Sequence, residues 1–441
     1  MALKLTVIGT GYLGATHAAA MAELGFEVLG LDVVPEKIEM LGQGRVPMYE
    51  PGLEELLRKH VAGIEGSSGR LRFTTSFEEA GAFGDVHFVC VNTPQKHGEY
   101  ACDMSYVESA FGSLGPHLRE GALVVGKSTV PVGSAARLAA ALPENVELAW
   151  NPEFLREGFA VDDTLHPDRI VVGVESERAE KLLREVYAGP VGEGSPFVVT
   201  DFPTAELVKT AANSFLATKI SFINAMAEVC EAADGDVVKL AEAIGHDDRI
   251  GKKFLRAGIG FGGGCLPKDI RAFMARAGEL GADQALTFLR EVDSVNMRRR
   301  GHMVELAREA VGGETFLGKR VAVLGATFKP DSDDVRDSPA LNVAGQIHLQ
   351  GGQVTVYDPK GMDNARRLFP TLGYAPSAVE AVRGADVVLH LTEWREFREL
   401  DPAELAEAAA TRIILDGRNA LDPVTWREAG WTYRAMGRPR A

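Results

Sequence analysis

The sequence predicts an α/β fold with two Rossmann-like, doubly wound domains, joined by a long central helix and a small helical domain. Apolar strand patterns alternate with helical patterns near both ends of the chain, a glycine-rich turn follows the first strand, and a long segment without proline or glycine fills the middle. Strands that alternate with helices favour parallel sheets with helices on both faces. At about 150 residues per domain, 441 residues suit three domains, and we expect them at residues 1–203, 204–300 and 301–441.

The N-terminal domain is predicted from short apolar runs. Its strands are expected at residues 3–8, 28–33, 86–91 and 122–126, and its first helix at residues 15–24. The C-terminal domain repeats this architecture, with strands expected at residues 320–324, 353–357, 387–391 and 413–415. The two domains therefore look like two versions of one fold.

The middle of the chain is predicted to be helical. Residues 206–233 are rich in Ala, Leu, Ile and Phe and indicate one long helix, and shorter helices are expected up to about residue 300. The run Arg298-Arg299-Arg300 lies near the end of this region. Cations are favoured at a helix C-terminus, so we interpret the run as a solvated helix end.

Composition excludes several classes of protein. Hydrophobic residues make up 46% of the chain and charged residues 25%, as in globular proteins, and the formal net charge is -15. This acidic balance argues against a nucleic-acid partner. No run approaches the roughly 20 apolar residues of a membrane span, and the N-terminus enters a strand pattern without a signal-peptide cleavage site. The sequence therefore favours a cytoplasmic protein.

The four cysteines are Cys90, Cys102, Cys230 and Cys265. None of them has C-x-x-C spacing, so neither a disulfide framework nor a metal site is predicted. Thiols that stay reduced fit the cytoplasm.

A dinucleotide-binding turn is predicted at Gly9-Thr10-Gly11-Tyr12-Leu13-Gly14. In this pattern the first glycine permits the turn, the second lets the backbone approach a pyrophosphate, and the third allows close helix packing. Asp32 follows Gly14 by 18 residues, where a carboxylate accepts the ribose hydroxyls and repels a 2′-phosphate. NAD is therefore expected rather than NADP, although the nearby cation Lys37 weakens this preference. The second Rossmann-like unit has only Gly325 at its first turn, which leaves open a different nucleotide or none.

A candidate nucleophile follows a glycine-rich segment, Gly258-Ile259-Gly260-Phe261-Gly262-Gly263-Gly264-Cys265-Leu266-Pro267-Lys268-Asp269. Cys265 is expected to open a helix, and the positive helix end lowers a thiol pKa from its usual value of about 8.5. Asp269 lies four residues further on, and therefore on the same helical face.

Lys209 and Asn213 form an i, i+4 pair inside the long apolar helix. They fit either a solvated stripe or a pair of hydrogen-bond donors to a developing oxyanion.

Further motifs complete a pattern along nearly the whole chain. They are Val91-Asn92-Thr93-Pro94, Lys127-Ser128-Thr129-Val130-Pro131, Asn151-Pro152-Glu153-Phe154-Leu155-Arg156-Glu157-Gly158, Phe328-Lys329-Pro330, Asp333-Asp334-Val335-Arg336 and Asp416-Gly417-Arg418. With the glycine turn, the Lys209 helix and the Cys265 segment, their order resembles the UDP-glucose/GDP-mannose dehydrogenase family. The resemblance implies a four-electron oxidation of UDP-glucose to UDP-glucuronate that uses two NAD per sugar. In it, Cys265 would form a thiohemiacetal and then a thioester.

The resemblance also implies roles for single residues. Lys209 and Asn213 would stabilise the oxyanion, Asp269 would orient the lysine or a water, and Thr129 and Glu157 would position or activate the hydrolytic water. The implied cofactor contacts are Gly9, Thr10, Gly11, Tyr12, Leu13, Gly14, Asp32, Lys37, Thr93, Thr129, Glu157, Lys268 and Arg336. The implied sugar-nucleotide contacts are Phe154, Leu155, Arg156, Glu157, Lys209, Asn213, Phe254, Leu255, Arg256, Ala257, Gly258, Gly262, Lys329 and Arg418. Arg249 resembles the arginine that reaches the neighbouring subunit's substrate, which implies a homodimer through the central helix.

Other substrates and functions fit parts of the pattern. Asp416-Gly417-Arg418-Asn419 resembles the UDP-glucose members of the family, whereas residues 254–258 depart from the Asn-rich loop of some bacterial relatives. GDP-mannose and UDP-N-acetylhexosamines therefore stay as alternative substrates. A two-electron β-hydroxyacid dehydrogenase would need no thiol, and a non-catalytic NAD sensor would need only the glycine turn.

Overall fold

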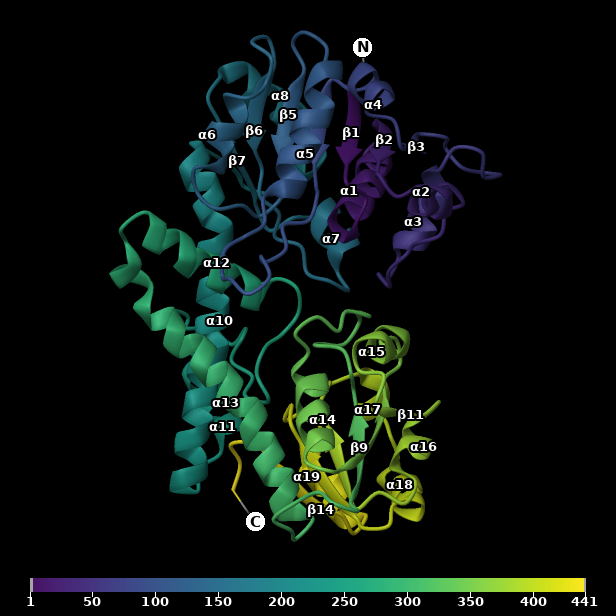
Figure 1. Cartoon of the computed structure of the whole chain (residues 1–441), viewed down its shortest axis with the longest axis vertical. Helices are drawn as coiled ribbons and strands as arrows, with labels where there is room; N and C mark the ends of the chain where they lie inside the picture. The colour runs from purple at the N-terminus through teal and green to yellow at the C-terminus, as the bar shows by residue number, and fades with distance from the viewer. Residues whose placement is uncertain (1–2, 440–441) are drawn as a thin grey trace. The chain divides into compact units, whose positions relative to one another are not determined.

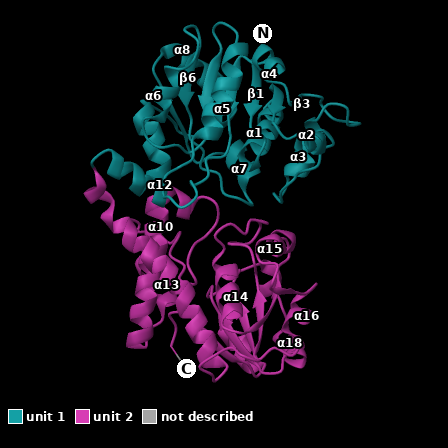
Figure 2. Ribbon diagram, viewed as in Figure 1, with its two compact units in different colours: residues 1–212, 271–281 teal, residues 213–270, 282–441 magenta. Residues whose placement is uncertain are grey.

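The computed structural model describes residues 3–439, and the chain divides into two compact units (Figures 1 and 2). Unit 1 comprises residues 1–212 and 271–281, and unit 2 comprises residues 213–270 and 282–441. Two helices, α10 (Phe202–Ala233) and α12 (Leu266–Glu279), have residues in both units. The three domain boundaries expected from the sequence stay a prediction, because the two units group residues only by compactness.

Unit 1 is built on an eight-stranded sheet in the order β3-β2-β1-β4-β5-β6-β7-β8. Its strands are β1 (Lys4–Ile8), β2 (Glu27–Leu31), β3 (Leu71–Thr74), β4 (Val86–Val89), β5 (Leu123–Gly126), β6 (Glu147–Trp150), β7 (Ile170–Val174) and β8 (Phe197–Thr200). All neighbours are parallel except β6 and β7. The first six strands have the order of a dinucleotide-binding fold, whose ligands bind at the carboxyl ends of the strands beside the switch between β1 and β4.

The strands of this sheet are apolar on both faces. Along β1, Leu5 and Val7 lie in one hydrophobic core while Ile8 lies in another, and successive residues of a strand point to opposite faces. Two cores require helices on both faces, which explains why these strands are continuous apolar runs rather than alternating ones. The helices of unit 1 are α1 (Tyr12–Glu23), α2 (Pro35–Gly42), α3 (Leu53–His60), α4 (Phe77–Phe83), α5 (Ser105–Leu114), η1 (Gly115–His117), α6 (Ser134–Ala139), α7 (Ala160–Leu165), α8 (Glu177–Val186) and α9 (Ala188–Gly192).

Two buried histidines make unit 1 sensitive to acid. Burial lowers the pKa of His87 to about 4 and that of His17 well below its ordinary value of 6.5. Between pH 6.5 and 4 the unfolded chain therefore binds protons that the folded chain does not, and stability falls as the pH falls. We expect the free energy of unfolding to decrease by up to about 1.4 kcal/mol per pH unit for each titrating histidine.

Urea unfolding between pH 7 and pH 5 measures this effect. His87→Asn replaces the ring with an amide that can still bond to Thr6 Oγ1, which lies 2.6 Å from His87 Nδ1, but does not titrate. Its stability should fall less steeply with pH than that of the wild type. Equal slopes for the two proteins would contradict the assignment.

Unit 2 contains a six-stranded, all-parallel sheet in the order β11-β10-β9-β12-β13-β14. Its strands are β9 (Arg320–Leu324), β10 (Gln353–Tyr357), β11 (Gly373–Tyr374), β12 (Val387–His390), β13 (Ile413–Asp416) and β14 (Thr432–Ala435). This is the strand order of β1 to β6 in unit 1, so the prediction of two Rossmann-like sheets is confirmed. Again Val321 and Val323 face one core while Ala322 and Leu324 face another.

The other helices of unit 2 pack beside this sheet or run along α10 (Figure 1). They are α11 (Val237–Gly245), η2 (Asp283–Leu286), α13 (Thr287–Ala310), α14 (Pro339–Leu349), α15 (Met362–Leu368), α16 (Ala378–Val382), α17 (Arg395–Arg398), α18 (Pro402–Ala408) and α19 (Pro423–Glu428). Among residues 3–439, no helix combines the length and apolar character that a membrane crossing requires.

The interpretation of residues 298–300 as a solvated helix end is wrong. Helix α13 continues to Ala310, and the side chains of Arg299 and Arg300 are almost fully buried. Only Arg298 is exposed. The two buried guanidinium groups find their partners in segments far away in the sequence, which a local charge pattern does not reveal.

Candidate active site

The glycine turn after β1 has the geometry of a dinucleotide-binding turn. Gly9 has φ +87°, and a Cβ atom on Gly14 would lie 1.9 Å from the Gly9 carbonyl oxygen. Asp32 follows β2 directly and holds the turn, because its Oδ2 accepts hydrogen bonds from the Thr10 N–H at 2.9 Å and from Lys37 Nζ at 2.7 Å. The turn thus presents the N-terminus of α1 at the carboxyl edge of the sheet, where phosphates bind.

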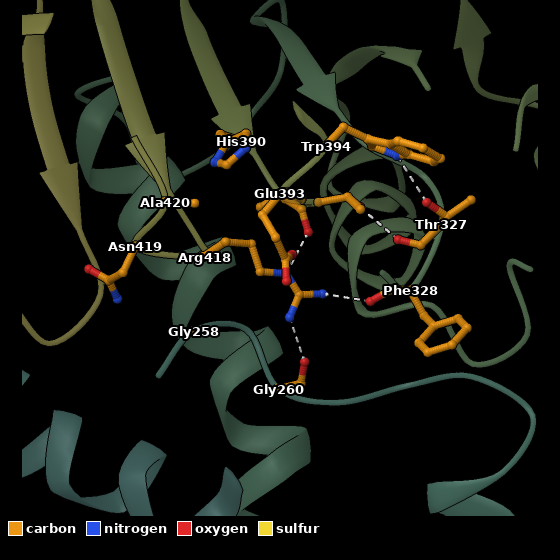
Figure 3. Close-up of polar contacts among 12 residues, drawn as sticks. Gly258, Gly260, Thr327, Phe328, His390, Glu393, Trp394, Arg418, Asn419 and Ala420 are labelled. Atoms are coloured by element: carbon orange, nitrogen blue, oxygen red, sulfur yellow. Dashed lines mark hydrogen bonds and ion pairs between the residues drawn. The ribbon is translucent and has the colours of Figure 1, made fainter. Parts of the chain in front are cut away.

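The corresponding turn of unit 2 is organised by Asp358, at the end of β10. Its Oδ2 accepts hydrogen bonds from the backbone N–H groups of Ala326 and Thr327 at 2.8 and 3.1 Å, and from Trp394 Nε1 at 3.0 Å. Figure 3 shows the Trp394 indole directed at Thr327. The second domain therefore keeps the acidic residue of the fold but surrounds it with protein donors.

Lys209 is buried and forms an ion pair with Glu153, with 2.8 Å between Nζ and Oε1. Its ammonium group also lies 5.7 Å from the centre of the Phe154 ring, and the Arg169 guanidinium lies 3.7 Å from the same ring. Burial contradicts the solvated-stripe interpretation of this lysine. The expected sugar-contact residue Phe154 and the expected oxyanion donor Lys209 thus lie together in unit 1.

The other expected residues of unit 1 lie in loops at the same sheet edge. Thr93 Oγ1 donates a hydrogen bond to the Thr129 carbonyl at 2.8 Å, which ties the loops that follow β4 and β5. Leu155 N–H donates to Glu153 Oε2 at 2.6 Å. Arg156 is exposed and pairs with Asp163, so the structure directs this guanidinium to a neighbouring carboxylate.

The buried side chain of Lys127 holds the first residue of the 151–158 loop. Lys127 Nζ donates to Asn151 Oδ1 at 2.8 Å, and Tyr187 Oη donates to the same oxygen at 2.6 Å. Burial lowers the pKa of Lys127 to about 8 and raises that of the neighbouring Cys90 thiol to about 12. Cys90 is therefore a protonated packing residue at neutral pH.

Glu50 is a site residue that the sequence analysis missed. Its carboxylate is buried and accepts hydrogen bonds from the Tyr12 hydroxyl and from the N–H groups of Gly158 and Ala160, both at 2.7 Å. One side chain thus joins the glycine turn to the loop that carries Glu157. Its only sequence signal is a carboxylate in the turn Tyr49-Glu50-Pro51-Gly52, which is also typical of a solvated loop.

Glu50→Gln is expected to weaken both segments. The amide nitrogen cannot accept a hydrogen bond, so one buried donor loses its partner at a cost of about 1–3 kcal/mol. We expect a higher KM for NAD and a lower unfolding midpoint. Glu55→Gln, an exposed change on the following helix, is the matched control. Unchanged steady-state kinetics in Glu50→Gln would show that the carboxylate only stabilises the fold.

Cys265 lies directly before α12 and has an exposed side chain, whereas Cys90, Cys102 and Cys230 are buried. Its carbonyl accepts the hydrogen bond from the Asp269 N–H at 2.9 Å that begins the helix. The expectation that this cysteine opens a helix is confirmed. A thiol in this place receives the field of the helix N-terminus.

Asn213 and Asp269 meet inside unit 2. Asn213 Nδ2 donates a hydrogen bond to Asp269 Oδ2 at 2.6 Å, and Lys268 Nζ lies 2.7 Å from Asp269 Oδ1. Asn213 and Asp269 are both buried, so Asn213 too does not belong to a solvated stripe. The carboxylate fixes the direction of the amide and leaves the Asn213 side chain pre-oriented, as an oxyanion donor has to be.

Arg418 is the centre of a second polar cluster (Figure 3). Its guanidinium donates hydrogen bonds to the carbonyls of Leu391 and Gly260, both at 2.8 Å, and to that of Phe328 at 3.2 Å, and it lies 3.4 Å from Glu393. Burial lowers its pKa from the ordinary value. Arg418 therefore joins the ends of β9 and β12 to the glycine-rich segment.

The Arg418 loop is positioned by the buried Asp416. Asp416 Oδ1 lies 2.9 Å from His390 Nδ1 and accepts the Arg418 N–H at 2.9 Å, while Oδ2 accepts the N–H of Leu421. Burial alone would raise the pKa of Asp416, but His390 and these backbone N–H groups hold it below the usual value. Charge and hydrogen bonding thus fix a loop expected to contact substrate.

The remaining expected contacts differ in their surroundings. Leu255, Ala257, Gly258 and Gly262 are buried, the first two in a hydrophobic cluster, whereas Phe254 and Arg256 are exposed. Lys329 Nζ lies 5.6 Å from the centre of the Phe328 ring. Arg336 pairs with Asp334 at 2.7 Å. Arg249 pairs with Asp247, and its side chain is 90% exposed, so within one chain it is directed to solvent.

Comparison with known protein families agrees with this arrangement. Residues 3–190 match the NAD-binding domain of the UDP-glucose/GDP-mannose dehydrogenase family, residues 203–298 match its central domain, and residues 322–423 match its UDP-binding domain. The glycine turn, the thiol segment and most of the unit 2 sheet each fall in one of these matches.

Individual relatives cover almost the whole chain. A UDP-glucose 6-dehydrogenase of Rhizobium meliloti is 41% identical over 444 residues, which cover 99% of this chain and 100% of the relative. The UDP-glucose 6-dehydrogenase YwqF of Bacillus subtilis is 38% identical over 447 residues, which cover 99% of this chain and 98% of the relative. The solved UDP-glucose dehydrogenase of Pyrobaculum islandicum superposes with a TM-score of 0.89 at 38% identity, covering 99% of this chain and 98% of that chain. The protein is thus an NAD-binding oxidoreductase that belongs to the UDP-glucose/GDP-mannose dehydrogenase family.

Proposed function

We propose that the protein oxidises UDP-glucose to UDP-glucuronate with two molecules of NAD, and that Cys265 is the covalent nucleophile. The observation that carries the proposal is the thiol itself: it is exposed, it opens a helix, and it follows a glycine-rich segment that permits close approach of a substrate. A simple alcohol oxidation needs no such thiol, whereas an oxidation to the acid does.

Bound NAD accepts a hydride in each of the two oxidations. The Cys265 thiolate adds to the aldehyde carbon that the first oxidation forms, and the resulting thiohemiacetal carries the hydrogen that leaves in the second. Water then breaks the carbon–sulfur bond of the thioester, which releases the carboxylate and restores the thiol. The net change is the loss of four electrons from the sugar C6 carbon and the gain of one oxygen atom from water.

The charged and polar residues supply the other parts of the reaction. Lys209 and Asn213 donate hydrogen bonds to the oxygen on C6, where negative charge develops. Asp269 orients Asn213, with which it shares a 2.6 Å hydrogen bond. Thr129 and Glu157 position the hydrolytic water. The glycine turn and Asp32 would hold the cofactor, and Lys329 and Arg418 would contact the nucleotide part of the substrate.

UDP-glucose is favoured over other sugar nucleotides by a difference in sequence identity between two groups of relatives. The UDP-glucose 6-dehydrogenases of R. meliloti and B. subtilis are 41% and 38% identical to the chain. The solved UDP-D-ManNAc dehydrogenase of Pyrococcus horikoshii, with a TM-score of 0.86, is 26% identical and covers all of both chains. The fold is common to both substrates, so the higher identity supports glucose.

The stoichiometry of NADH formation tests the proposal. With limiting UDP-glucose and excess NAD, two NADH should form per sugar, and mass analysis should find UDP-glucuronate. UDP-N-acetylmannosamine and GDP-mannose, tested in parallel, should show kcat/KM values at least about 100-fold lower. One NADH per sugar would indicate a two-electron dehydrogenase, and no NADH with any sugar nucleotide would favour an NAD sensor.

A homodimer through α10 is the assembly we propose. Phe215, Phe222 and Val229 are exposed apolar residues at seven-residue intervals on this helix. That spacing places them in one stripe, as in helices that pack against a partner helix. Phe222→Glu should convert a dimer to a monomer in sedimentation velocity, whereas Leu349→Glu, an equally drastic change at an exposed position, should not. A monomeric wild type would refute the assembly.

A cytoplasmic location fits the same proposal. The reaction requires a Cys265 thiol that stays reduced, and thiols persist in the cytoplasm, where disulfides are rare. Labelling the thiol in intact cells with a membrane-permeant alkylating reagent, and comparing it with an impermeant one, would test this.

A further inference from the structure

The segment at residues 258–264, which leads to the proposed nucleophile, is held by arginine side chains through its carbonyl oxygens. Arg418 Nη1 donates to the Gly260 carbonyl at 2.8 Å, and Arg299 Nε donates to the Gly258 carbonyl at 3.4 Å. Arg299 is completely buried beneath the segment. Because the segment is rich in glycine, its own side chains contribute little that could fix its course.

Helix α13 supplies the contacts at the centre of the segment. Asn296 accepts the Phe261 N–H at 2.7 Å and donates to the Phe261 carbonyl at 3.0 Å. Arg300, one turn further along, donates to the same carbonyl at 3.0 Å and to Asp337 Oδ1 at 2.7 Å. The peptide of Phe261 is therefore clamped from one helix, by two side chains that are both buried.

Asp337 connects this clamp to the other side of the thiol segment. It has φ +43°, a left-handed conformation that is strained for an aspartate, and Arg300 binds both its carboxylate and its carbonyl. A Cβ atom on Gly262 would lie 2.3 Å from the Asp337 carbonyl oxygen, so the two backbones touch. The neighbouring Arg336 carbonyl accepts the Gly263 N–H at 2.9 Å. Arg300 thus holds both backbones that meet next to Cys265.

The burial of Arg300 is costly, and its geometry is specific. Its Nε atom is buried and has no hydrogen-bond partner among the described residues. A buried charge pair is weak evidence of stabilisation, because hydrophobic residues of similar volume often give a more stable core. The planar guanidinium nevertheless reaches a carboxylate and two carbonyls in fixed directions, which a lysine ammonium does not. A role in positioning explains why such a group lies here.

We propose that Arg300 is a positioning residue for Cys265: it fixes the Phe261 peptide and Asp337, and through them the place and ionisation of the thiol. The proposal rests on the role of Cys265 proposed above. It predicts that a change at Arg300 alters the chemistry of the Cys265 thiol through the backbone of residues 258–264.

The reactivity of Cys265 towards iodoacetamide tests the proposal without any turnover. Cys265 is the exposed cysteine of the four, all of which lie among the described residues, so its peptide reports the reaction by mass spectrometry. Arg300→Lys keeps the charge but loses the planar fork, and Arg300→Met loses both. Arg298→Met is the matched control, because Arg298 lies on the same helix with an exposed side chain.

In Arg300→Lys we expect the pH midpoint of alkylation to shift and kcat for uronate formation to fall by about 10-fold to 100-fold, because small misplacements of reacting groups have effects of this size. Arg298→Met should match the wild type in both measurements. Asp337→Asn keeps an oxygen that can accept from Arg300 but removes the negative charge of the carboxylate. It should shift the pH midpoint of alkylation in the same direction by a smaller amount. If the Arg300 variants do not fold, Asp337→Asn still tests the proposal.

Two results separate this proposal from the proposed function. If Arg300→Lys and Asp337→Asn fold and keep wild-type alkylation profiles and kcat, Arg300 has a structural role alone and the positioning proposal is overturned. If Cys265→Ser still forms uronate at the wild-type rate, the proposed function fails instead, whatever the Arg300 variants do.

Discussion

Cys265→Ser is expected to lower the rate of UDP-glucuronate formation by on the order of 10³-fold or more, because it removes the nucleophile of a covalent mechanism. A serine hydroxyl is far less ionised than a thiol at neutral pH. It is also a weaker nucleophile than a thiolate towards the aldehyde carbon. The oxidation of the alcohol does not use the sulfur, so the variant should still reduce NAD in a first turnover. The measurement is NADH formed per enzyme active site in a rapid-mixing experiment, together with mass analysis of the sugar product.

The control for this experiment is Cys230→Ala, which removes a buried thiol from α10. It should form two NADH per sugar, as the wild type does. If Cys265→Ser formed uronate at an unchanged rate, Cys265 would not be the nucleophile of the reaction. If this variant and the wild type both formed one NADH per sugar and no uronate, a two-electron dehydrogenase would become the better interpretation. If Cys265→Ser formed neither aldehyde nor uronate while still binding NAD, the substituted side chain would have blocked substrate binding.

The parts of the fold that could be predicted from the sequence depend on local patterns. β9 and β10 begin and end at the residues expected, because a short apolar run between turn residues is itself the signal for a buried strand. The glycine turn is equally local, since its three glycines meet one steric requirement each. The antiparallel direction of β7 relative to β6 was not predicted. The direction of a strand and the strand that it pairs with depend on the segment that connects the two strands, and not on the residues of the strand itself.

The parts of the site that could not be predicted depend on contacts between distant segments. Glu50 lies 108 residues from Gly158, and Arg300 lies 37 residues from Asp337. A charged residue that finds such a partner has the same local pattern as one in solvent, so Arg300 was expected to be solvated and Glu50 was not singled out. Cys265 differed because its signal is local: three consecutive glycines precede a cysteine that lies directly before a helix.

The glycine turn offers a second large effect, in which Gly11 and Gly14, two glycines three residues apart, should respond in opposite ways to the addition of a methyl group. A Cβ atom on Gly14 would lie 1.9 Å from the Gly9 carbonyl oxygen and 2.9 Å from the Gly9 carbonyl carbon. Both are backbone atoms, so no side chain can move aside, and α1 has to shift away from β1. We expect Gly14→Ala to destabilise the protein by about 3 kcal/mol or more.

Gly11→Ala has a different expected result. The nearest atom to a Cβ there is Asn92 Oδ1 at 3.9 Å, and Gly11 has φ -70°, which alanine adopts readily. The folded state should therefore tolerate the methyl group, and the loss of flexibility in the unfolded chain stabilises by about 0.4–1 kcal/mol. The same methyl group would, however, occupy the space in which the pyrophosphate approaches the backbone, so we expect the Kd for NAD to rise at least about 10-fold.

Urea unfolding and NAD titration of the two variants separate packing from binding. Gly14→Ala should lose stability whether or not NAD is present. Gly11→Ala should be slightly more stable than the wild type without NAD and should lose only the gain that NAD confers on the wild type. If Gly11→Ala bound NAD as tightly as the wild type, the pyrophosphate would not approach this turn, and the assignment of the NAD site to residues 9–14 would be wrong. Because the two residues lie in one turn and differ only in what a methyl group meets, a difference in their behaviour would locate the cofactor by steric contact alone.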